Sequence, residues 1–414
     1  KNMLNLSIIP ILLLLSNVCD FQKTDKKMSI SNIFDAIDTD KMKDFSFIER
    51  RKHFLKVLSS DDDLRKLAYE EAQDFGFVSH DSFVKSNFPC KNYSIAGSGK
   101  NVNVLTPLDI SVVAALGDSL TAGLGLDARN IFGVLWENRG KVFDIGGISD
   151  SATLPNFFRV FNPSIKGVSL KTTFIRNKGE AFNLAVSGDT TQDLMEQVTN
   201  ILNRMRNDKS INMEKDWKMI SIFIGNNDIC RSCEAGRAKD FTVKLLKERI
   251  EAALDKLKAE MPKAFINLIT MLDVYRVSEL NIGIICSALH LYECPCVAFS
   301  KNLTKVIELN TEFQTAITEI ADLDKYSNSD DFTVVTQPFF ENTFVPMINN
   351  KPDLSYFAPD CFHLSAKGHA QVALSLWNSL FEPITLKKRH WFVGEKFKCP
   401  TMDRPFFATK KNSV

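Results

Sequence analysis

The sequence predicts an α/β fold in which a parallel sheet of about five strands carries helices on both faces, preceded by a helical extension. Three observations support this prediction. Short, almost continuously apolar segments recur between residues 108 and 385, as expected for strands buried on both faces. Segments with apolar residues three and four positions apart separate them, as in amphipathic helices. Gly, Ser, Asn or Asp follows several of the apolar segments directly.

The strands and helices alternate along the chain. The predicted strands span residues 109–116, 181–186, 219–225, 264–272 and 332–338. The predicted helices span residues 191–206, 241–262, 300–321 and 365–383. Such alternation favours parallel pairing, because each helix returns the chain to the same end of the sheet. Residues 127–180 show neither pattern and are predicted to form a long surface excursion.

The N-terminal residues 1–19 are predicted to be a secretory signal peptide. Their apolar run, Leu6 to Leu15, is too short to span a bilayer comfortably, and small residues suited to cleavage follow it. Lys1 provides only a weak basic region, so an uncleaved anchor or a buried helix is the alternative. The C-terminus carries no anchor signal, and a secreted, extracellular protein is expected.

Three further segments complete the predicted organisation. Residues 20–98 are rich in charge, with apolar residues at helical spacing, and end in a Pro-, Gly- and Ser-containing linker around Cys90. Residues 99–386 form the main domain, and residues 387–414 a C-terminal tail. The 414 residues can bury a full core, and the net charge of +1 gives no indication of a nucleic-acid partner.

The cysteines are expected to form disulfides. Eight remain if Cys19 leaves with the signal peptide, and an even number is typical of an oxidising compartment. They are Cys90, Cys230, Cys233, Cys286, Cys294, Cys296, Cys361 and Cys399. A redox or zinc role for the Cys230–Cys233 pair is the alternative, but no second pair with suitable spacing accompanies it. Asn92 and Asn302 are candidate glycosylation sites.

The candidate chemistry lies where the predicted strands end. Ser119 follows the first strand, Gly188 the second and Asn227 the third, while Asp360 and His363 follow the last. Because ligands bind beyond the carboxyl ends of parallel strands, these residues are expected to meet at one edge. Ser119 would be the nucleophile, His363 the base and Asp360 its orienting acid. The Ser119 N–H, the Gly188 N–H and the Asn227 side chain would form an oxyanion hole.

Each of these residues also has a simpler interpretation. Ser119 alone is more often a helix N-cap than a nucleophile. Gly188 and Asn227 could belong to ordinary turns, and Asp and His three residues apart recur by chance. Asp118 is predicted to be a turn or capping residue outside the chemistry. All of these residues occur together, in order and at successive strand ends, and this combination favours a catalytic role.

With these blocks assembled, the chain resembles the SGNH, or GDSL, hydrolase superfamily. "GDSLTAG" (117–123), "NLAVSGDTT" (183–191), "IGNNDIC" (224–230) and "PDCFH" (359–363) match its four blocks. "CPC" (294–296), "FTVVTQPFFEN" and "LWNSLFEP" extend the resemblance to its animal phospholipase B-like branch. The resemblance covers about residues 108–385. Repeated units and a membrane anchor occur in that branch, whereas this sequence shows one unit.

The resemblance implies a flavodoxin-like three-layer α/β/α fold, a serine esterase mechanism and no metal or other cofactor. It implies a secreted lipase of phospholipase B type that releases fatty acid from phospholipids and lysophospholipids through an acyl-enzyme. The expected partners are a phospholipid or other lipid ester substrate and, transiently, a membrane or micelle surface. The alternatives are a carboxylesterase or acyloxyacyl hydrolase on other lipid esters, and a non-catalytic secreted binding protein.

Overall fold

The computed structural model describes residues 53, 56, 87–90, 97, 99–234, 236–298 and 303–413. The predicted signal peptide lies outside these residues, as do the glycosylation candidates Asn92 and Asn302 and nearly all of the predicted helical extension. No helix within the described ranges is long and apolar enough to cross a membrane.

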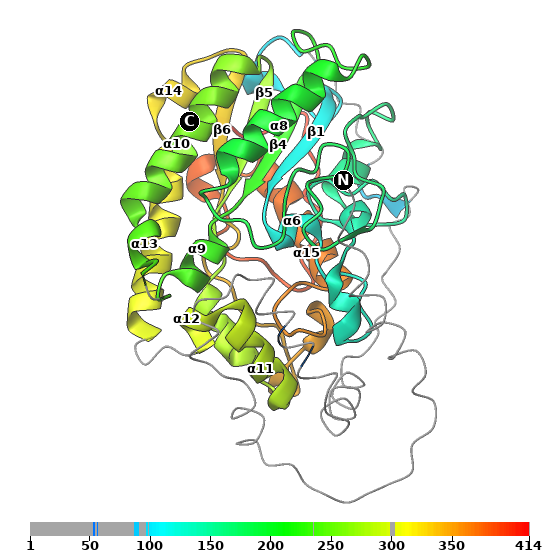
Figure 1. The fold of residues 1–414 in the computed structure, drawn as a ribbon. Helices are drawn as coiled ribbons and strands as arrows, with labels where there is room; N and C mark the ends of the chain where they lie inside the picture. Colours follow the sequence, from blue (N-terminus) through cyan, green and yellow to red (C-terminus); the bar gives the residue numbers. More distant parts are fainter. Residues whose placement is uncertain are drawn as a thin grey trace, which may run out of the picture.

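A four-stranded parallel sheet forms the centre of the molecule (Figure 1). Its order is β1 (Ile110–Gly117), β4 (Trp217–Phe223), β5 (Ala264–Ile269) and β6 (Phe332–Gln337). All four strands are those that the apolar segments predict. Nearly every residue in them is buried, which explains why their sequences are continuously apolar rather than alternating.

The fifth predicted strand, residues 181–186, does not form a regular strand. Leu184 N–H donates to the Ala115 carbonyl at 2.9 Å and Ala115 N–H to the Phe182 carbonyl at 3.0 Å, so the segment lies along β1. Only an isolated bridge results, because Ala181 adopts a positive φ of 48° and the guanidinium of Arg139 binds carbonyls of the segment. The sheet therefore has four regular strands rather than about five.

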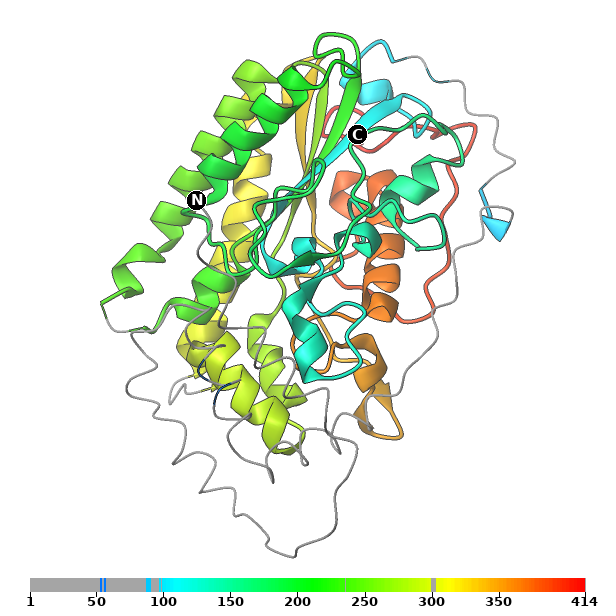
Figure 2. The ribbon, with the colours of Figure 1, turned by 45° about the vertical axis from the view of Figure 1, so that its right-hand side comes forward.

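Helices cover both faces of the sheet, so the fold has three layers (Figure 2). On one face, α8 (Leu194–Asn207), α10 (Val243–Glu260) and α13 (Leu303–Ala321) pack against side chains such as Ile220 and Ile266. On the other, α15 (Ala366–Phe381) and α7 (Leu154–Phe158) pack against their strand neighbours, including Met219 and Phe265. Successive strand residues point to opposite faces, which divides the core into these two clusters.

The remaining elements are short and lie mostly at the ends of the sheet. They are η2 (Val102–Val104), α6 (Ser119–Ala122), η3 (Ile131–Leu135), β2 (Trp136–Glu137), η4 (Arg139–Lys141), β3 (Thr173–Phe174), α9 (Asn226–Arg231), η5 (Ala238–Asp240), η6 (Val274–Leu280), α11 (Gly283–Glu293), α12 (Pro295–Ala298), α14 (Asp324–Ser327), β7 (Met347–Ile348), β8 (Lys351–Pro352), η7 (Leu354–Tyr356) and η8 (Ile384–Leu386). β2 pairs with β3 and β7 with β8, both antiparallel.

Residues 127–180 are not the surface excursion that their irregular sequence predicts. Phe143, Phe157 and Phe158 are buried and belong to the core cluster beneath α15. Arg139 is buried as well. The segment contributes core residues from short turns and single helical turns, and such turns leave no periodic pattern in the sequence.

The eight cysteines form four disulfides: Cys90–Cys399, Cys230–Cys294, Cys233–Cys296 and Cys286–Cys361. Cys230 and Cys233 each bond to one cysteine of the 294–296 motif. They are therefore not bonded to each other, as a redox pair would be. Cys399 ties the C-terminal tail to Cys90, and Phe407 of the tail is buried in the core.

Candidate active site

Ser119 is the first residue of α6 and lies two residues beyond the carboxyl end of β1. Asp118, and not Ser119, is the N-cap, and its side chain accepts from the Leu120 N–H at 3.0 Å. Gln197 of α8 holds the strand end, because its side chain exchanges two hydrogen bonds of 2.8 Å with the backbone of Gly117. The Ser119 hydroxyl is therefore not used as the helix cap. It lies at the positive end of a helical turn and can bond to another partner.

That partner is His363. Its Nε2 lies 2.8 Å from Ser119 Oγ, and its Nδ1 lies 2.8 Å from Oδ2 of Asp360. The carboxylate accepts from Nδ1–H, which leaves Nε2 as the acceptor of the serine proton. The exposed fractions are 5% for Ser119, 1% for His363 and 0% for Asp360. The three predicted residues thus form a continuous, buried chain of hydrogen bonds.

The loop that carries Asp360 and His363 is tightly folded. Oδ1 of Asp360 accepts from the backbone N–H groups of Phe362 at 3.1 Å and His363 at 3.0 Å. Between them, Cys361 has a positive φ of 59° and is bonded to Cys286 of α11. The loop therefore fixes the acid, the base and their spacing through backbone bonds and one disulfide.

The candidate oxyanion donor Gly188 lies in a turn with a positive φ of 86°. Its neighbour Ser187 donates a hydrogen bond of 2.6 Å to Glu137, which forms a buried ion pair of 2.8 Å with Arg139. Arg139 also donates to the Ala185 carbonyl at 2.8 Å. A fully buried ionic network from the 127–180 segment therefore holds the turn that presents Gly188.

The third block is bound to the same turn. Asn227 lies in the first turn of α9, and its Nδ2 donates to the Asp189 carbonyl at 2.9 Å. An amide has two N–H donors, so one remains for a reacting oxygen. Asp228 accepts from the backbone N–H of Thr191 at 3.0 Å and from its hydroxyl at 2.5 Å. Residues 187–191 and α9 are therefore held together as one unit.

Three buried carboxyl groups flank these elements. Burial raises the pKa of Asp118 to about 7, that of Asp189 to about 7 and that of Asp228 to about 6. The pKa of Asp228 is raised less than its full burial implies, because the side chain and backbone of Thr191 donate hydrogen bonds to its charged form. The ring of His363 bonds to Asp360 and Ser119, and to none of these three carboxyl groups among the described residues. That Asp118 lies outside the chemistry stays a prediction.

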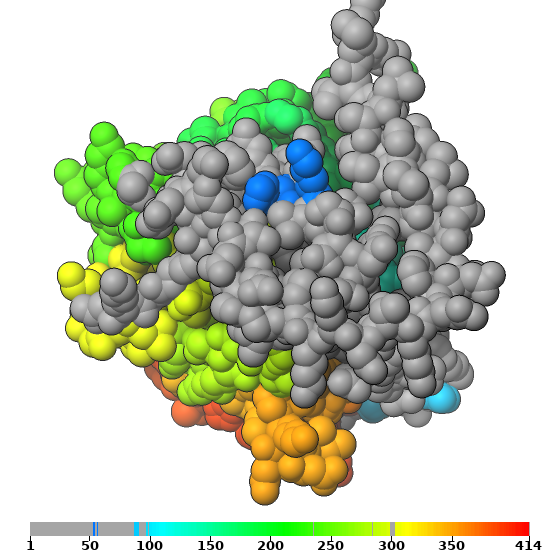
Figure 3. All heavy atoms as spheres, turned by 60° about the horizontal axis from the view of Figure 1, so that its bottom comes forward, coloured from blue at the N-terminus to red at the C-terminus, as the bar shows by residue number. Residues whose placement is uncertain are grey.

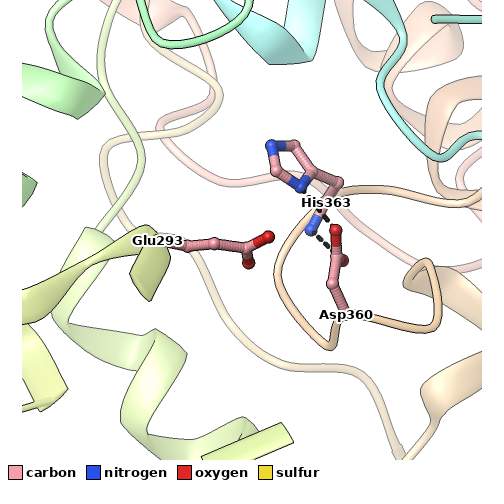
Figure 4. Close-up of side chains that lie close together, drawn as sticks. All are labelled: Glu293, Asp360 and His363. Carbon is pink, nitrogen blue, oxygen red and sulfur yellow. Dashed lines mark hydrogen bonds and ion pairs between the residues drawn. The ribbon is translucent and has the colours of Figure 1, made fainter. Parts of the chain in front are cut away.

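One residue near the centre was not anticipated by the sequence. Glu293, the last residue of α11, points toward Asp360 and His363 (Figure 4). One ligand atom from each of the three residues lies within 4.8 Å of the others, a spacing that a metal ion could bridge. His363 already bonds to Asp360 through Nδ1 and to Ser119 through Nε2, so Glu293 adds a second carboxyl group beside that hydrogen-bonded chain.

The missed residues differ in the signal that the sequence gives for them. Glu137 and Arg139 lie in a segment without periodicity, so nothing marked them as a buried pair. Glu293 follows Cys286 by seven positions and His290 by three, which is the spacing of one helix face. His290, on the same face, is buried and hydrogen-bonded to the carbonyl of Cys361 at 3.0 Å.

Comparisons with known proteins find relatives over most of this chain. The mouse protein "Phospholipase B1, membrane-associated" is 39% identical over 344 residues, which cover 79% of this chain and 23% of the mouse protein. Its human counterpart is 40% identical over 329 residues, covering 76% and 22%. The chain thus spans less than a quarter of the length of these relatives.

Among solved structures, phospholipase A1 from Streptomyces albidoflavus NA297 is 15% identical with a TM-score of 0.34, covering 65% of this chain and 99% of that one. The GDSL-like lipase/acylhydrolase family model matches residues 113–376, a range that begins in β1 and ends in α15 and contains all five candidate residues. The chain belongs to the GDSL-like lipase/acylhydrolase family.

Proposed function

We propose that this chain is a secreted serine lipase of phospholipase B type, which releases fatty acid from phospholipids and lysophospholipids through an acyl-enzyme on Ser119. The observation that carries the proposal is the hydrogen-bond chain from Ser119 Oγ through His363 to Asp360 at the carboxyl end of the sheet. The identity to the phospholipase B1 relatives supports the choice of a phospholipid ester as substrate.

In the proposed mechanism, Ser119 Oγ attacks the acyl carbonyl carbon while His363 Nε2 takes its proton. The imidazolium then gives that proton to the departing alcohol, which leaves the acyl group on Ser119. In a second half-reaction, water attacks the acyl carbon while His363 takes a proton from it. The bond from that carbon to Ser119 Oγ breaks, the imidazolium returns the proton to Oγ, and the fatty acid leaves. Asp360 keeps the proton on Nδ1 and stabilises the imidazolium in both steps.

The oxyanion would be stabilised by the N–H groups of Ser119 and Gly188 and by the second N–H of Asn227. Gly188 is suited to this role because its positive φ turns the backbone in a way that L side chains rarely permit. Removing one such donor typically slows turnover about 10²–10³-fold.

We also propose that the enzyme acts in an extracellular compartment. Three of its four disulfides connect α9, α11, α12 and the loop that carries Asp360 and His363, here called the catalytic loop. Such bonds persist in oxidising environments. Residues 1–19 would be a signal peptide and 20–98 a helical extension, followed by the hydrolase domain of 99–386 and a tail of 387–414. Asn92 and Asn302 would be glycosylated.

For the lipid surface, the hairpin of β7 and β8 is the proposed contact. Met347 and Ile348 are 59% and 56% exposed, and Asn349 and Asn350 form a tight turn with φ of 50° and 61°. Figure 3 shows the hairpin (orange) projecting beside the segment of α11 (yellow-green). Just before it, Val345 is buried against the Cys286–Cys361 disulfide, which links the hairpin to the catalytic loop.

Product analysis on phosphatidylcholine vesicles tests the proposed activity. Mass spectrometry should detect free fatty acid, then lysophosphatidylcholine and glycerophosphocholine, with wild-type protein and not with Ser119→Ala. Phosphocholine or diacylglycerol as the product would contradict cleavage of the acyl ester. Activity confined to soluble acetyl esters would point to a carboxylesterase instead.

A paired substitution tests the hairpin. Met347→Ser with Ile348→Ser should lower the rate on vesicles about tenfold or more, because two apolar side chains no longer enter the interface. The rate on a soluble ester should not change. Leu386→Ser with Met402→Ser is the matched control, since both side chains are exposed, at 71% and 84%, outside the catalytic loop. Equal losses on vesicles in both pairs would reject the hairpin as the contact.

A further inference from the structure

One face of α11 lies along the catalytic loop. Cys286, His290 and Glu293 are four and three residues apart, so they share a face of the helix. Cys286 bonds to Cys361, and Nε2 of His290 lies 3.0 Å from the carbonyl oxygen of Cys361. Two successive turns of α11 are therefore fixed to the loop segment between the acid and the base, and Glu293 comes one turn later on the same face.

Glu293 is placed at the centre of the site by this packing. It is 2% exposed, while Asp360 and His363 are 0% and 1% exposed. One of its carboxylate oxygens, a carboxylate oxygen of Asp360 and a ring nitrogen of His363 all lie within 4.8 Å of one another. Figure 4 shows its side chain extending from the end of α11 toward the other two. The imidazole thus has a second carboxyl group beside it.

Resting on the Ser119–His363–Asp360 mechanism above, we propose that Glu293 is a positioning residue, the second carboxylate that acts on the catalytic base. It acts through His363 and does not touch the substrate. When Ser119 Oγ forms its bond to the acyl carbon, the carbonyl electron pair moves to the oxyanion and the serine proton moves to Nε2. Asp360 binds the resulting imidazolium directly at Nδ1, and Glu293, ionised in this proposal, stabilises it from α11.

Other titratable groups lie on α11 and on the described elements packed against it. Burial lowers the pKa of His290 to about 4, so it is neutral at working pH, and burial raises the pKa of Tyr292 above its ordinary value, so it is neutral too. On η6, which packs against α11, burial likewise raises the pKa of Tyr275. Arg276 and Glu279 of η6 pair with each other at 2.7 Å in a partly exposed position.

On α12, which also packs against α11, Cys296 is disulfide-bonded and does not titrate. Within the described residues, Asp360 from the loop and Glu293 from the helix each place a carboxylate oxygen within 4.8 Å of a ring nitrogen of His363. Asp118, Asp189 and Asp228 lie on other elements of the site, and burial raises the pKa of each. Opposite charge within about 4–6 Å of a titrating group shifts its pKa toward the charged form. Removing the charge of Glu293 should destabilise the imidazolium relative to the neutral imidazole, so that His363 becomes a weaker base.

The test is the pH profile of kcat/KM on a soluble ester, which does not depend on lipid binding. In Glu293→Gln, the acidic limb should move about one pH unit lower, because a less stable imidazolium loses its proton at lower pH. The plateau should fall about tenfold, the ratio that corresponds to one pKa unit. Glu293→Asp, which keeps the charge, should stay closer to wild type. Glu382→Gln is the control, a buried carboxyl at the far end of α15.

Dividing kcat/KM at each pH by the folded fraction measured at that pH removes the effect of stability on the limb, so a destabilised variant remains informative. Glu293→Met provides a second neutral side chain of similar length. An acidic limb at the wild-type pH in Glu293→Gln or in Glu293→Met would overturn the proposal, even with lower activity. Ser119→Ala separates failure of the Glu293 proposal from failure of the Ser119 mechanism. If the mechanism is wrong, Ser119→Ala retains the activity of the wild type on the same ester.

Discussion

His363 Nε2 lies 2.8 Å from Ser119 Oγ, although 244 positions separate the two residues in the sequence. Ser119 is presented by the end of β1, at one edge of the sheet, while His363 comes from the loop that precedes α15. The distance is that of a formed hydrogen bond, so the base needs no rearrangement to reach its proton.

Ser119→Ala should abolish hydrolysis, whereas Asp118→Asn should retain most of it. Asn keeps the helix-capping oxygen that accepts from the Leu120 N–H, so the loss of stability should stay below about 1 kcal/mol. The measurement is kcat/KM on a soluble ester, together with the thermal midpoint of both variants. A large loss of kcat in a fully folded Asp118→Asn protein would assign Asp118 a chemical role.

Asn227→Ala should lower kcat about 10²–10³-fold with little change in KM, because its side chain is the proposed donor to the oxyanion. The neighbouring Asn226 is the matched control. Its side chain accepts from the Leu272 N–H at 3.2 Å, so Asn226→Ala removes an amide of the same size with a structural role. If both variants lose kcat equally, the effect of Asn227 is structural as well.

The central sheet and the candidate residues could be predicted because each leaves a local signal. A strand buried on both faces is a short apolar run, and a polar residue directly after such a run is conspicuous. Four of the five predicted strands are regular strands in the structure. Residues 181–186 have the same apolar character, but a positive φ at Ala181 and binding to Arg139 interrupt the regular ladder. Neither feature can be seen in the sequence of the segment.

The polar supports of the site were harder to predict because each depends on a partner distant in sequence. The Glu137–Arg139 pair is buried only because residues 183–187 fold over it and supply acceptors and a donor. The same limit applies to the cysteines. Their even number predicted disulfides, but the pairing of Cys286 with Cys361 follows from the packing of α11 on the loop.

Glu137→Gln should destabilise the protein and impair catalysis together. The change leaves Arg139 buried without its counter-charge and weakens the acceptor of the Ser187 hydroxyl. Breaking a buried pair in this way costs about 3–5 kcal/mol, and a displaced Ser187 moves the neighbouring Gly188 N–H. Urea unfolding and kcat measure the two effects. Glu196→Gln, in an exposed ion pair, should change the unfolding free energy by less than about 0.5 kcal/mol.

Removing the Cys286–Cys361 bond should reduce turnover more than removing the Cys90–Cys399 bond. The first bond fixes the loop between acid and base, and small displacements of catalytic groups lower rates steeply, here by about tenfold or more. The second joins the linker to the tail. Either pair of serines should lower the unfolding free energy by about 2–5 kcal/mol. Comparing kcat of the folded fractions separates the two bonds, and equal kcat values would contradict a special role for Cys286.

Asp144→Asn should stabilise the protein, and more so at higher pH. Asp144 is buried, and burial raises the pKa of its carboxyl to about 8. One oxygen lies 3.4 Å from the Thr121 hydroxyl, and the other has no hydrogen-bond partner in the described part of the chain. The folded protein therefore keeps this group protonated up to about pH 8, whereas the unfolded chain releases the proton near its ordinary value of 3.8.

Because the folded state holds the extra proton throughout that window, the contribution of Asp144 to wild-type stability should fall as pH rises from about 4 to 8. The amide carries no proton to lose, so the difference between Asp144→Asn and wild type should grow from near zero at pH 4 to at least about 2 kcal/mol at pH 8. Urea unfolding at both pH values measures it. Asp150→Asn, at an exposed position, is the control and should follow wild type. A difference that stays constant with pH would show that Asp144 is ionised in the folded protein.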